Sequence, residues 1–174
     1  MMKFFPALVF IICGVFSAVS LAAQTNPKAA PTSSKAMPTE NANGIKWLSY
    51  TEGLAQAKSR QKLIFVDLYA DWCVPCRIMD ANVYTDSGIA ELLNERFIPV
   101  KLDADSQEKI SCDGQLKTAQ KCFHEVWELK ALPSFVLVAP KGLSILTVTQ
   151  SLTVTDLKEL LTKFLSKEKE WLAR

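Results

Sequence analysis

An almost entirely apolar segment leads directly into a pair of closely spaced cysteines. Residues 63–70 (LIFVDLYA) are rich in β-branched and aromatic side chains, which predicts a strand buried on both faces. Residues 74–81 predict a helix that begins inside the sequence Cys73-Val74-Pro75-Cys76. A strand buried on both faces must lie within a sheet that other elements cover on each side, so the chain is constrained to a layered α/β fold.

The other predicted elements follow an order that suits such a fold. Strands at 63–70 and 97–103 are separated by helical segments, which predicts that they run parallel. Strands at 134–138 and 143–149 are joined by a short Pro-Gly-containing segment, which is typical of a hairpin. Helices are predicted at 50–61, 74–81, 87–96, most of 107–129 and the C-terminal segment. The core order is β-α-β-α-β-β-α after a leading helix, a central mixed sheet flanked by helices.

Three of the predicted helices begin at residues that can serve as N-caps. Thr51 is the candidate for the leading helix, and Thr85 or Asp86 for the helix at 87–96. Thr153 and Asp156 have the spacing of a capping box at the start of the last helix.

Residues 1–22 are typical of an export signal. Lys3 precedes the apolar run 4–16, and small residues follow it up to Ala22 and Ala23, where cleavage is expected. An uncleaved anchor is the alternative, because residues 4–23 carry no charge and about 20 apolar residues span a bilayer. Lipid attachment at Cys13 fits poorly, since the bulky Ile12 precedes it. Each alternative predicts that the remaining chain is periplasmic, either free or anchored to the inner membrane.

Residues 23–44 are rich in Pro, Ala, Ser, Thr and Asn, which predicts a flexible linker before a single domain at 45–174. The net charge is +2, and the basic residues are mixed with acidic ones along the chain. A nucleic-acid-binding surface would need a clustered basic stripe, so this pattern argues against one.

The two cysteines of the Cys73-Val74-Pro75-Cys76 motif are placed for thiol–disulfide chemistry. A sulfur at a helix N-terminus lies near unpaired backbone N–H groups and the positive end of the helix dipole, and both favour a thiolate. We therefore expect Cys73 to be an exposed thiolate that attacks disulfides, and Cys76, one turn further along, to resolve the mixed disulfide. Pro75 suits the first helical turn, where its missing N–H costs nothing.

Two other uses of this motif remain open from the sequence. A zinc site needs four ligands, and Cys112, Cys122 and His124 do not have the spacing of a compact second half. A purely structural disulfide between Cys73 and Cys76 would close a very small loop, which constrains the unfolded chain least.

The stretch FVDLYADWCVPC resembles the thioredoxin superfamily, and within it the periplasmic C-terminal domain of the thiol:disulfide interchange protein DsbD. The similarity runs over about residues 47–164 and includes TDSGIAELL, VKLDAD and ELKALPSFVLVAPKG. The resemblance implies that Cys73 is the nucleophile, Cys76 the resolving thiol and Pro133 a cis-proline that faces them.

Further site residues follow from the same resemblance. Asp67 matches a buried acid that moves the proton of the resolving cysteine, and a carboxylate in an apolar strand is costly without such a role. Lys101 matches a lysine that pairs with this acid, although a solvated lysine is an alternative. Trp72, Pro75 and Leu132 would border the substrate, although plain core packing would also explain Trp72 and Leu132.

Residues 111–124 depart from the resemblance, because they are longer than the family's usual connection and contain Cys112 and Cys122. We expect these cysteines to form a second disulfide that fastens the insertion. A second redox pair that exchanges with Cys73 and a pair of free buried thiols are the alternatives.

Together these features predict an exported thiol–disulfide oxidoreductase that reduces disulfides in periplasmic proteins without a cofactor or a metal. Its expected partners are disulfide-containing exported proteins and a membrane electron donor of the DsbD type. An oxidase or isomerase is the main enzymatic alternative. A thioredoxin-like module that only binds a partner is the alternative from another class.

Overall fold

The computed structural model describes residues 39–40 and 44–173. The chain divides into two units, Met1–Ser34 and Lys35–Arg174, and all described residues belong to the second. The predicted signal segment 1–22 and most of the predicted linker 23–44 therefore lie outside the described residues. Within the described part of the chain, no helix is both long enough and apolar enough to cross a membrane.

A four-stranded mixed sheet forms the centre of the second unit. Its strands are β3 (Leu63–Tyr69), β4 (Phe97–Asp103), β7 (Ser134–Val138) and β8 (Ser144–Thr149), in the spatial order β4-β3-β7-β8. β3 and β4 run parallel, whereas β7 is antiparallel to both β3 and β8. The predicted parallel pair and the predicted hairpin are both confirmed.

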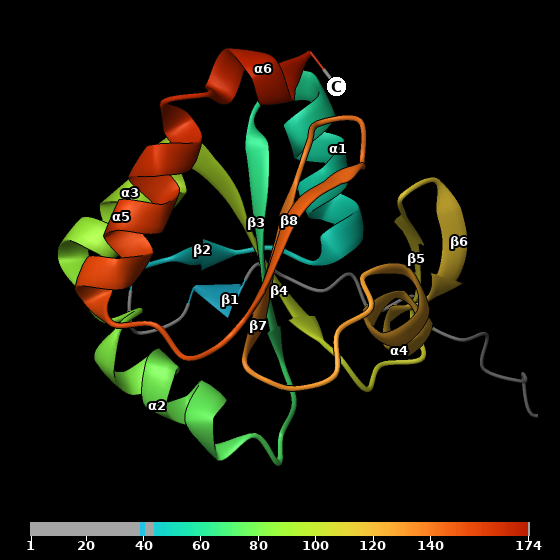
Figure 1. Ribbon diagram of the computed structural model, residues 1–174, viewed down its shortest axis with the longest axis horizontal. Coiled ribbons are helices and arrows are strands. Elements are labelled where there is room, and N and C mark those ends of the chain that lie inside the picture. Colours follow the sequence, from blue (N-terminus) through green and yellow to red (C-terminus); the bar gives the residue numbers. More distant parts are fainter. Residues whose placement is uncertain (1–38, 41–43, 174) are drawn as a thin grey trace, which may run out of the picture. The chain divides into compact units, whose positions relative to one another are not determined.

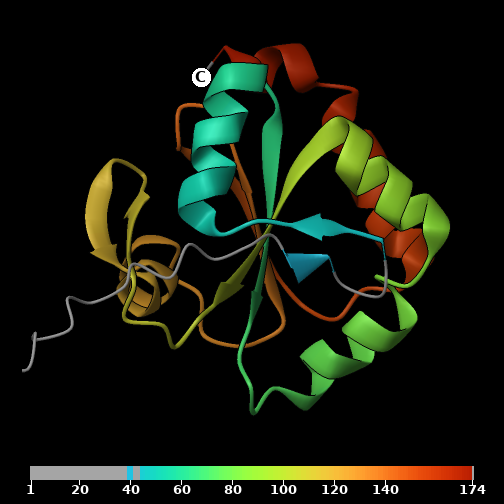
Figure 2. The same cartoon turned by 180° about the vertical axis from the view of Figure 1, so that it is seen from behind.

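Helices cover both faces of this sheet, and Figures 1 and 2 show α1 on one side with α3 and α5 on the other. Side chains of β3 alternate between the two faces: Ile64, Val66 and Leu68 join the core under α1, while Leu63 and Phe65 join the core under α3 and α5. The α/β architecture expected from the sequence is confirmed. The helices are α1 (Tyr50–Arg60), α2 (Val74–Asn82), α3 (Ser87–Arg96), α5 (Val154–Leu165) and α6 (Glu168–Leu172).

The helix starts are mostly those that the sequence predicts. Asp86 caps α3, and Thr153 with Asp156 forms the capping box of α5. The leading helix differs, because Ser49 rather than Thr51 is its N-cap. Ser49 accepts a hydrogen bond from the Glu52 N–H, and the Glu52 carboxylate accepts one from the Ser49 N–H. This reciprocal pair satisfies two backbone donors at the helix start.

Residues 107–129 are predicted from the sequence to be mostly helical, and this prediction is wrong. The segment begins with a hairpin of β5 (Lys109–Cys112) and β6 (Gln115–Thr118), and continues into α4 (Ala119–Lys121) and the π-helix η1 (Cys122–Val126). The turn residues Asp113 and Gly114 both have positive φ angles, 46° and 77°. Asp-Gly is a strong signal for a two-residue hairpin turn, since both central residues of that turn need positive φ.

Two contacts fasten this inserted hairpin. A disulfide joins Cys112 of β5 to Cys122 of η1, and both cysteines are fully buried in the core under α1. At the turn, the Asp113 carboxylate accepts hydrogen bonds from the N–H and the hydroxyl of Ser144 at the start of β8. The insertion is therefore part of the folded core rather than a loose surface loop.

A short N-terminal extension reaches the outer edge of the sheet. β1 (Thr39–Glu40) pairs with β2 (Lys46–Trp47), so a two-residue strand lies within the range predicted as a linker. Leu48 then makes an isolated parallel bridge to Val100 of β4. Pro99 lies on this edge strand, where a missing N–H is tolerated because no β3 hydrogen bond depends on it.

The burial of the Cys112–Cys122 disulfide gives a first prediction. The double variant Cys112→Ala/Cys122→Ala should lower the free energy of unfolding by about 2–3 kcal/mol, because the crosslink no longer restricts the unfolded chain. Urea denaturation followed by circular dichroism measures this difference, with Ser111→Ala as the control on the same strand. Equal stability of the double variant and the wild type would contradict a structural role for the disulfide.

Candidate active site

The cysteine pair lies where β3 ends and α2 begins, with Cys73 as the N-cap of α2. Its Sγ accepts a hydrogen bond from the Cys76 N–H at 3.2 Å, and Pro75 occupies the first helical turn. The two cysteines form a disulfide with a Cα–Cα distance of 5.3 Å. The N–H that caps the sulfur in this oxidised form is also placed to stabilise a thiolate on Cys73 after reduction.

Cys73 is buried, whereas the sequence predicts an exposed sulfur. In the disulfide form Cys73 is 1% exposed and Cys76 5% exposed, and Tyr69 and Leu132 pack against the pair. The expectation of exposure assumed that a helix N-terminus at a loop is open to solvent. In this protein the helix N-terminus is buried, because side chains from the segments before α2 and before β7 pack against the cysteines.

Apolar side chains close to the cysteine pair in the sequence are exposed on the surface. Trp72, Val74 and Ile78 are 66%, 54% and 55% exposed, and Pro75 is also exposed. The Trp72 indole N–H donates to the Asp105 carboxylate at 2.7 Å, which ties the active-site loop to the segment after β4. Exposed apolar patches on folded proteins commonly mark contact sites for other chains.

The segment before β7 brings Pro133 and Leu132 to the same site. The Leu132–Pro133 peptide bond is cis, as the resemblance implies. Pro133 is buried, and the half-buried Leu132 contacts the cysteine cluster. Leu132 thus lies at the border between the core and the cysteine pair.

Asp67 lies in the middle of β3 and is 3% exposed. Its register partner on β4 is Lys101, whose ammonium lies 3.4 Å from Asp67 Oδ2. The Tyr84 hydroxyl donates to Asp67 Oδ1 at 3.0 Å. Burial raises the pKa of Asp67 to about 6, and this rise is opposed by the nearby Lys101 charge and by the Tyr84 hydrogen bond. A carboxyl group with this pKa can both take and release a proton near neutral pH.

Lys101 is held in a cluster that the sequence analysis does not anticipate. Its ammonium contacts the rings of Trp47, Tyr69 and Tyr84, with centroid distances of 5.3–5.6 Å, and it also bonds the Asp80 carboxylate. Cation–π contacts of this kind stabilise a charged ammonium that has left water. The lysine is therefore a fixed internal partner of Asp67 rather than a solvated side chain.

Tyr84 and Asp80 are the site residues that sequence reasoning misses. Asp80 lies four residues after Cys76 on α2, and this spacing of one turn is the only sequence signal for it. Tyr84 lies in the connection between α2 and α3, where no motif marks it. Burial and the neighbouring Asp67 charge raise the pKa of Tyr84 well above its ordinary value, so it remains a hydrogen-bond donor at neutral pH.

The second disulfide is separate from this site. Cys112 and Cys122 belong to the core under α1, with no exposed surface, whereas Cys73 and Cys76 cluster with Ala70. The Cys112–Cys122 disulfide thus lies in a different cluster from the Cys73–Cys76 pair, a position that agrees with a structural role. Among the described residues, no group of three or more His, Cys, Asp or Glu side chains is placed to hold a metal ion.

The fold and the site together define a class of protein. A mixed sheet with a Cys-X-X-Cys disulfide at the start of a helix, beside a cis-proline and a buried carboxyl, is the arrangement of a thioredoxin-like thiol–disulfide oxidoreductase. The model of the Thioredox_DsbH family, described as "Protein of unknown function, DUF255", matches residues 28–167. The chain belongs to this family.

Individual proteins show a distant sequence likeness and a shared fold. The chain is 29% identical over 90 residues to thiol:disulfide interchange protein DsbD 2 of Pseudomonas aeruginosa, a match that covers 51% of this chain but only 14% of that protein. A thioredoxin from Thermus thermophilus superposes with a TM-score of 0.59 at 22% identity, covering 72% of this chain and 90% of that one. A structure titled "DsbH Oxidoreductase" superposes with a TM-score of 0.55 at 17% identity, covering 79% and 95%.

These results confirm the expected superfamily and refine the expected relationship. The expected likeness to the C-terminal domain of DsbD is present as a distant one. The family whose model matches most of the chain is Thioredox_DsbH.

The Tyr84–Asp67 hydrogen bond gives a second prediction. Tyr84→Phe should raise the pKa of Asp67 above about 6, because the lost bond stabilises the ionised carboxylate. A hydrogen bond to a charged group is worth about 1.5–3 kcal/mol, so we expect a rise of roughly one pH unit or more. Carboxyl-carbon NMR titration of Asp67 measures it.

Tyr69→Phe is the matched control for this experiment. The Tyr69 ring also packs on Lys101, but its hydroxyl makes no hydrogen bond to Asp67. An unchanged Asp67 titration in Tyr84→Phe, or an equal change in both variants, would contradict the role given to the Tyr84 hydroxyl.

Proposed function

We propose that this protein is an exported reductase that transfers two electrons from its Cys73–Cys76 dithiol to disulfides in other exported proteins. The observation that carries the proposal is the position of Cys73 Sγ as the N-cap of α2, where the Cys76 N–H donates to it. This position favours ionisation of Cys73 over Cys76 and so distinguishes the attacking sulfur from the resolving one.

The proposed reaction is a dithiol–disulfide exchange in two steps. The Cys73 thiolate attacks one sulfur of the substrate disulfide and forms a mixed disulfide with it, while the substrate S–S bond breaks and its other sulfur leaves as a thiolate. Cys76 then loses its proton and attacks Cys73 Sγ, which releases the second substrate thiolate and forms the Cys73–Cys76 disulfide. The substrate is reduced by two electrons, and the protein is oxidised by two.

Asp67 is the proposed proton acceptor for Cys76. Its pKa of about 6 supports this role, because a carboxyl group that is mostly ionised at neutral pH is available to take a proton and can return it later. Tyr84 and Lys101 are positioning residues in this proposal, since they hold the two carboxylate oxygens of Asp67.

The exposed apolar side chains around the cysteine pair support a protein substrate. Trp72, Val74 and Ile78 offer a surface on which an extended or partly folded chain can lie, and Leu132 borders the sulfurs. The sulfurs are covered in the disulfide form, so an electron donor that reduces this form would contact the same surface before exchange occurs.

The location and the electron donor are further parts of the proposal. Residues 1–22 would direct export, and they would either be cleaved or anchor the domain to the inner membrane. A membrane electron carrier of the DsbD type would then return the Cys73–Cys76 disulfide to the dithiol, because exported compartments lack the cytosolic reductants.

Cysteine variants test the chemistry. Insulin reduction should fall to the uncatalysed rate in Cys73→Ser, and Cys76→Ser should accumulate a mixed disulfide with insulin that a non-reducing gel detects. The double variant Cys112→Ala/Cys122→Ala is the control, and it should retain activity while it is folded. Activity that survives Cys73→Ser would remove this cysteine from its role, and an inactive wild type would favour a module that only binds a partner.

The reduction potential of the Cys73–Cys76 pair tests the direction. The spacer Val74-Pro75 contains no charge or histidine that would further stabilise the thiolate, so a strongly oxidising pair is not expected. We expect a value near that of thioredoxin, about −270 mV, from equilibration with glutathione. A value near about −120 mV would indicate an oxidase instead.

A further inference from the structure

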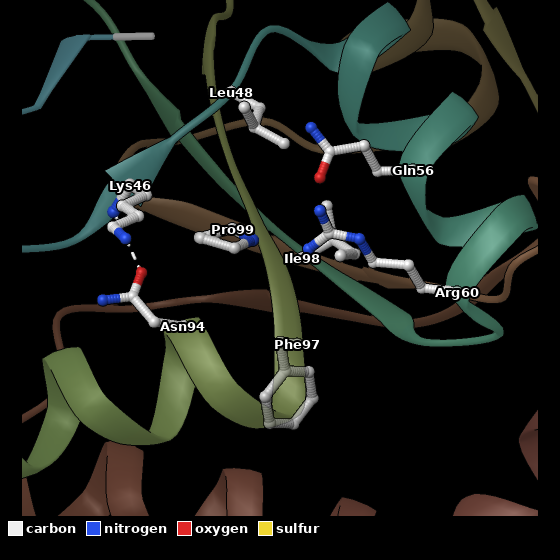
Figure 3. A pocket seen from close by; sticks show the side chains of 8 residues that line it. All are labelled: Lys46, Leu48, Gln56, Arg60, Asn94, Phe97, Ile98 and Pro99. Carbon is white, nitrogen blue, oxygen red and sulfur yellow. Dashed lines mark hydrogen bonds between the residues drawn. The ribbon is translucent and has the colours of Figure 1, made fainter.

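A cavity of ≈ 540 Å³ lies beside the first half of β4, away from the cysteine pair. Because β3 and β4 are parallel, the start of β4 lies at the end of the sheet opposite to the cysteine pair, which follows the end of β3. Figure 3 shows Gln56 and Arg60 extending from α1 toward the edge of β4, with Lys46 and Asn94 across from them. The lining residues are Lys46, Leu48, Gln56, Arg60, Asn94, Phe97, Ile98 and Pro99.

The charged groups of this cavity are both positive. Lys46 and Arg60 line it, and none of the lining residues is acidic. Within the described part of the chain, neither the Lys46 ammonium nor the Arg60 guanidinium makes a hydrogen bond or an ion pair. Two unpaired cations that line one cavity favour an anion as its occupant.

The remaining walls are suited to an apolar group. Leu48 and Pro99 contribute apolar surface, and the methylene groups of Lys46, Gln56 and Arg60 add to it. The Gln56 amide adds an uncharged group that can donate a hydrogen bond. Polar and apolar groups share the walls about equally, so a cavity of this size can hold a small molecule that has both kinds of group.

Part of the cavity wall is held in place by Asn94 of α3. Its side chain accepts a hydrogen bond from the Lys46 N–H at 2.9 Å and donates one to the Gly44 carbonyl at 2.8 Å. These bonds fix the start of β2 against α3, so the wall exists before any ligand arrives. A preformed wall lowers the entropy that binding would cost.

The backbone at this edge argues against a peptide strand as the occupant. The outward-facing groups of this edge are already paired with Leu48. The Leu48 N–H donates to the Pro99 carbonyl, and the Leu48 carbonyl accepts from the Lys101 N–H. Pro99 itself has no N–H, so an incoming strand would find no donor there. The cavity is therefore suited to a small molecule that side chains recognise rather than to an added strand.

We propose that this cavity binds a small organic carboxylate, with its anionic group between Lys46 and Arg60 and its apolar part against Leu48 and Pro99. The site is distinct from the cysteine pair and does not depend on the function proposed above. Its chemistry selects for a molecule that has both a negative charge and an apolar body, and a molecule with only one of these should bind more weakly.

NMR titration of the full chain tests this proposal with octanoate as the probe. Octanoate should shift the backbone amide signals of Gln56, Asn94 and Ile98. Octanamide, which has the same chain without the charge, should bind about five-fold more weakly, or more weakly still, because it forms no ion pair with either cation. Inorganic phosphate, which has charge without a chain, should also bind more weakly, because it buries no apolar surface in the cavity. Equal affinity for either of them, or no shift at these amides, would overturn the proposal.

Matched variants show whether the two cations are responsible. Lys46→Gln/Arg60→Gln should weaken octanoate binding by up to about 25-fold, because it removes two exposed ion pairs that each contribute up to a factor of roughly five. Lys58→Gln removes an exposed cation from the same helix without touching the cavity, and it should leave the affinity unchanged. Circular dichroism confirms that each variant is folded, and equal affinity of the double variant and the control would overturn the proposal.

Discussion

Strand β3 is hydrogen-bonded along both edges and covered on both faces, and the rest of the unit is arranged around it. Its neighbours β4 and β7 occupy the two edges, and its side chains enter both hydrophobic cores. A strand in that position has no freedom of register, because a shift of one residue would move each side chain to the other face. The Cys-X-X-Cys motif that follows β3 therefore lies at a fixed place at the end of the sheet.

The same burial creates the electrostatic character of the site. Asp67 is carried into the interior by β3, and loss of water raises its pKa to about 6. An ionised carboxylate is tolerated there because Lys101 and Tyr84 bond it, while three aromatic rings and Asp80 hold Lys101 in turn. The network keeps the pKa of the Asp67 carboxyl group near neutral pH inside a core that is otherwise apolar. A pKa in this range is the condition for proton transfer near neutral pH.

The insertion between β4 and β7 shows where local sequence patterns mislead. Its alanine, glutamine and lysine residues favour helix, yet the chain turns back at Asp113-Gly114 and pairs β5 with β6. The turn signal was present in the sequence, but the disulfide and the Ser144 contact with Asp113 join residues 10 and 31 positions apart. Such contacts override the modest preferences of individual residues.

The sequence by itself determined the sheet strands, most helix starts and the cysteine pair with its helix. These depend on hydrophobic periodicity, caps and a motif, all of which act between residues close in the chain. Only the tertiary structure decided that Cys73 is covered in its disulfide form, that Lys101 lies among three rings, and that Tyr84 and Asp80 join Asp67 and Lys101. The physical reason is that burial and pKa are properties of a residue's surroundings, and those surroundings are assembled from distant parts of the chain.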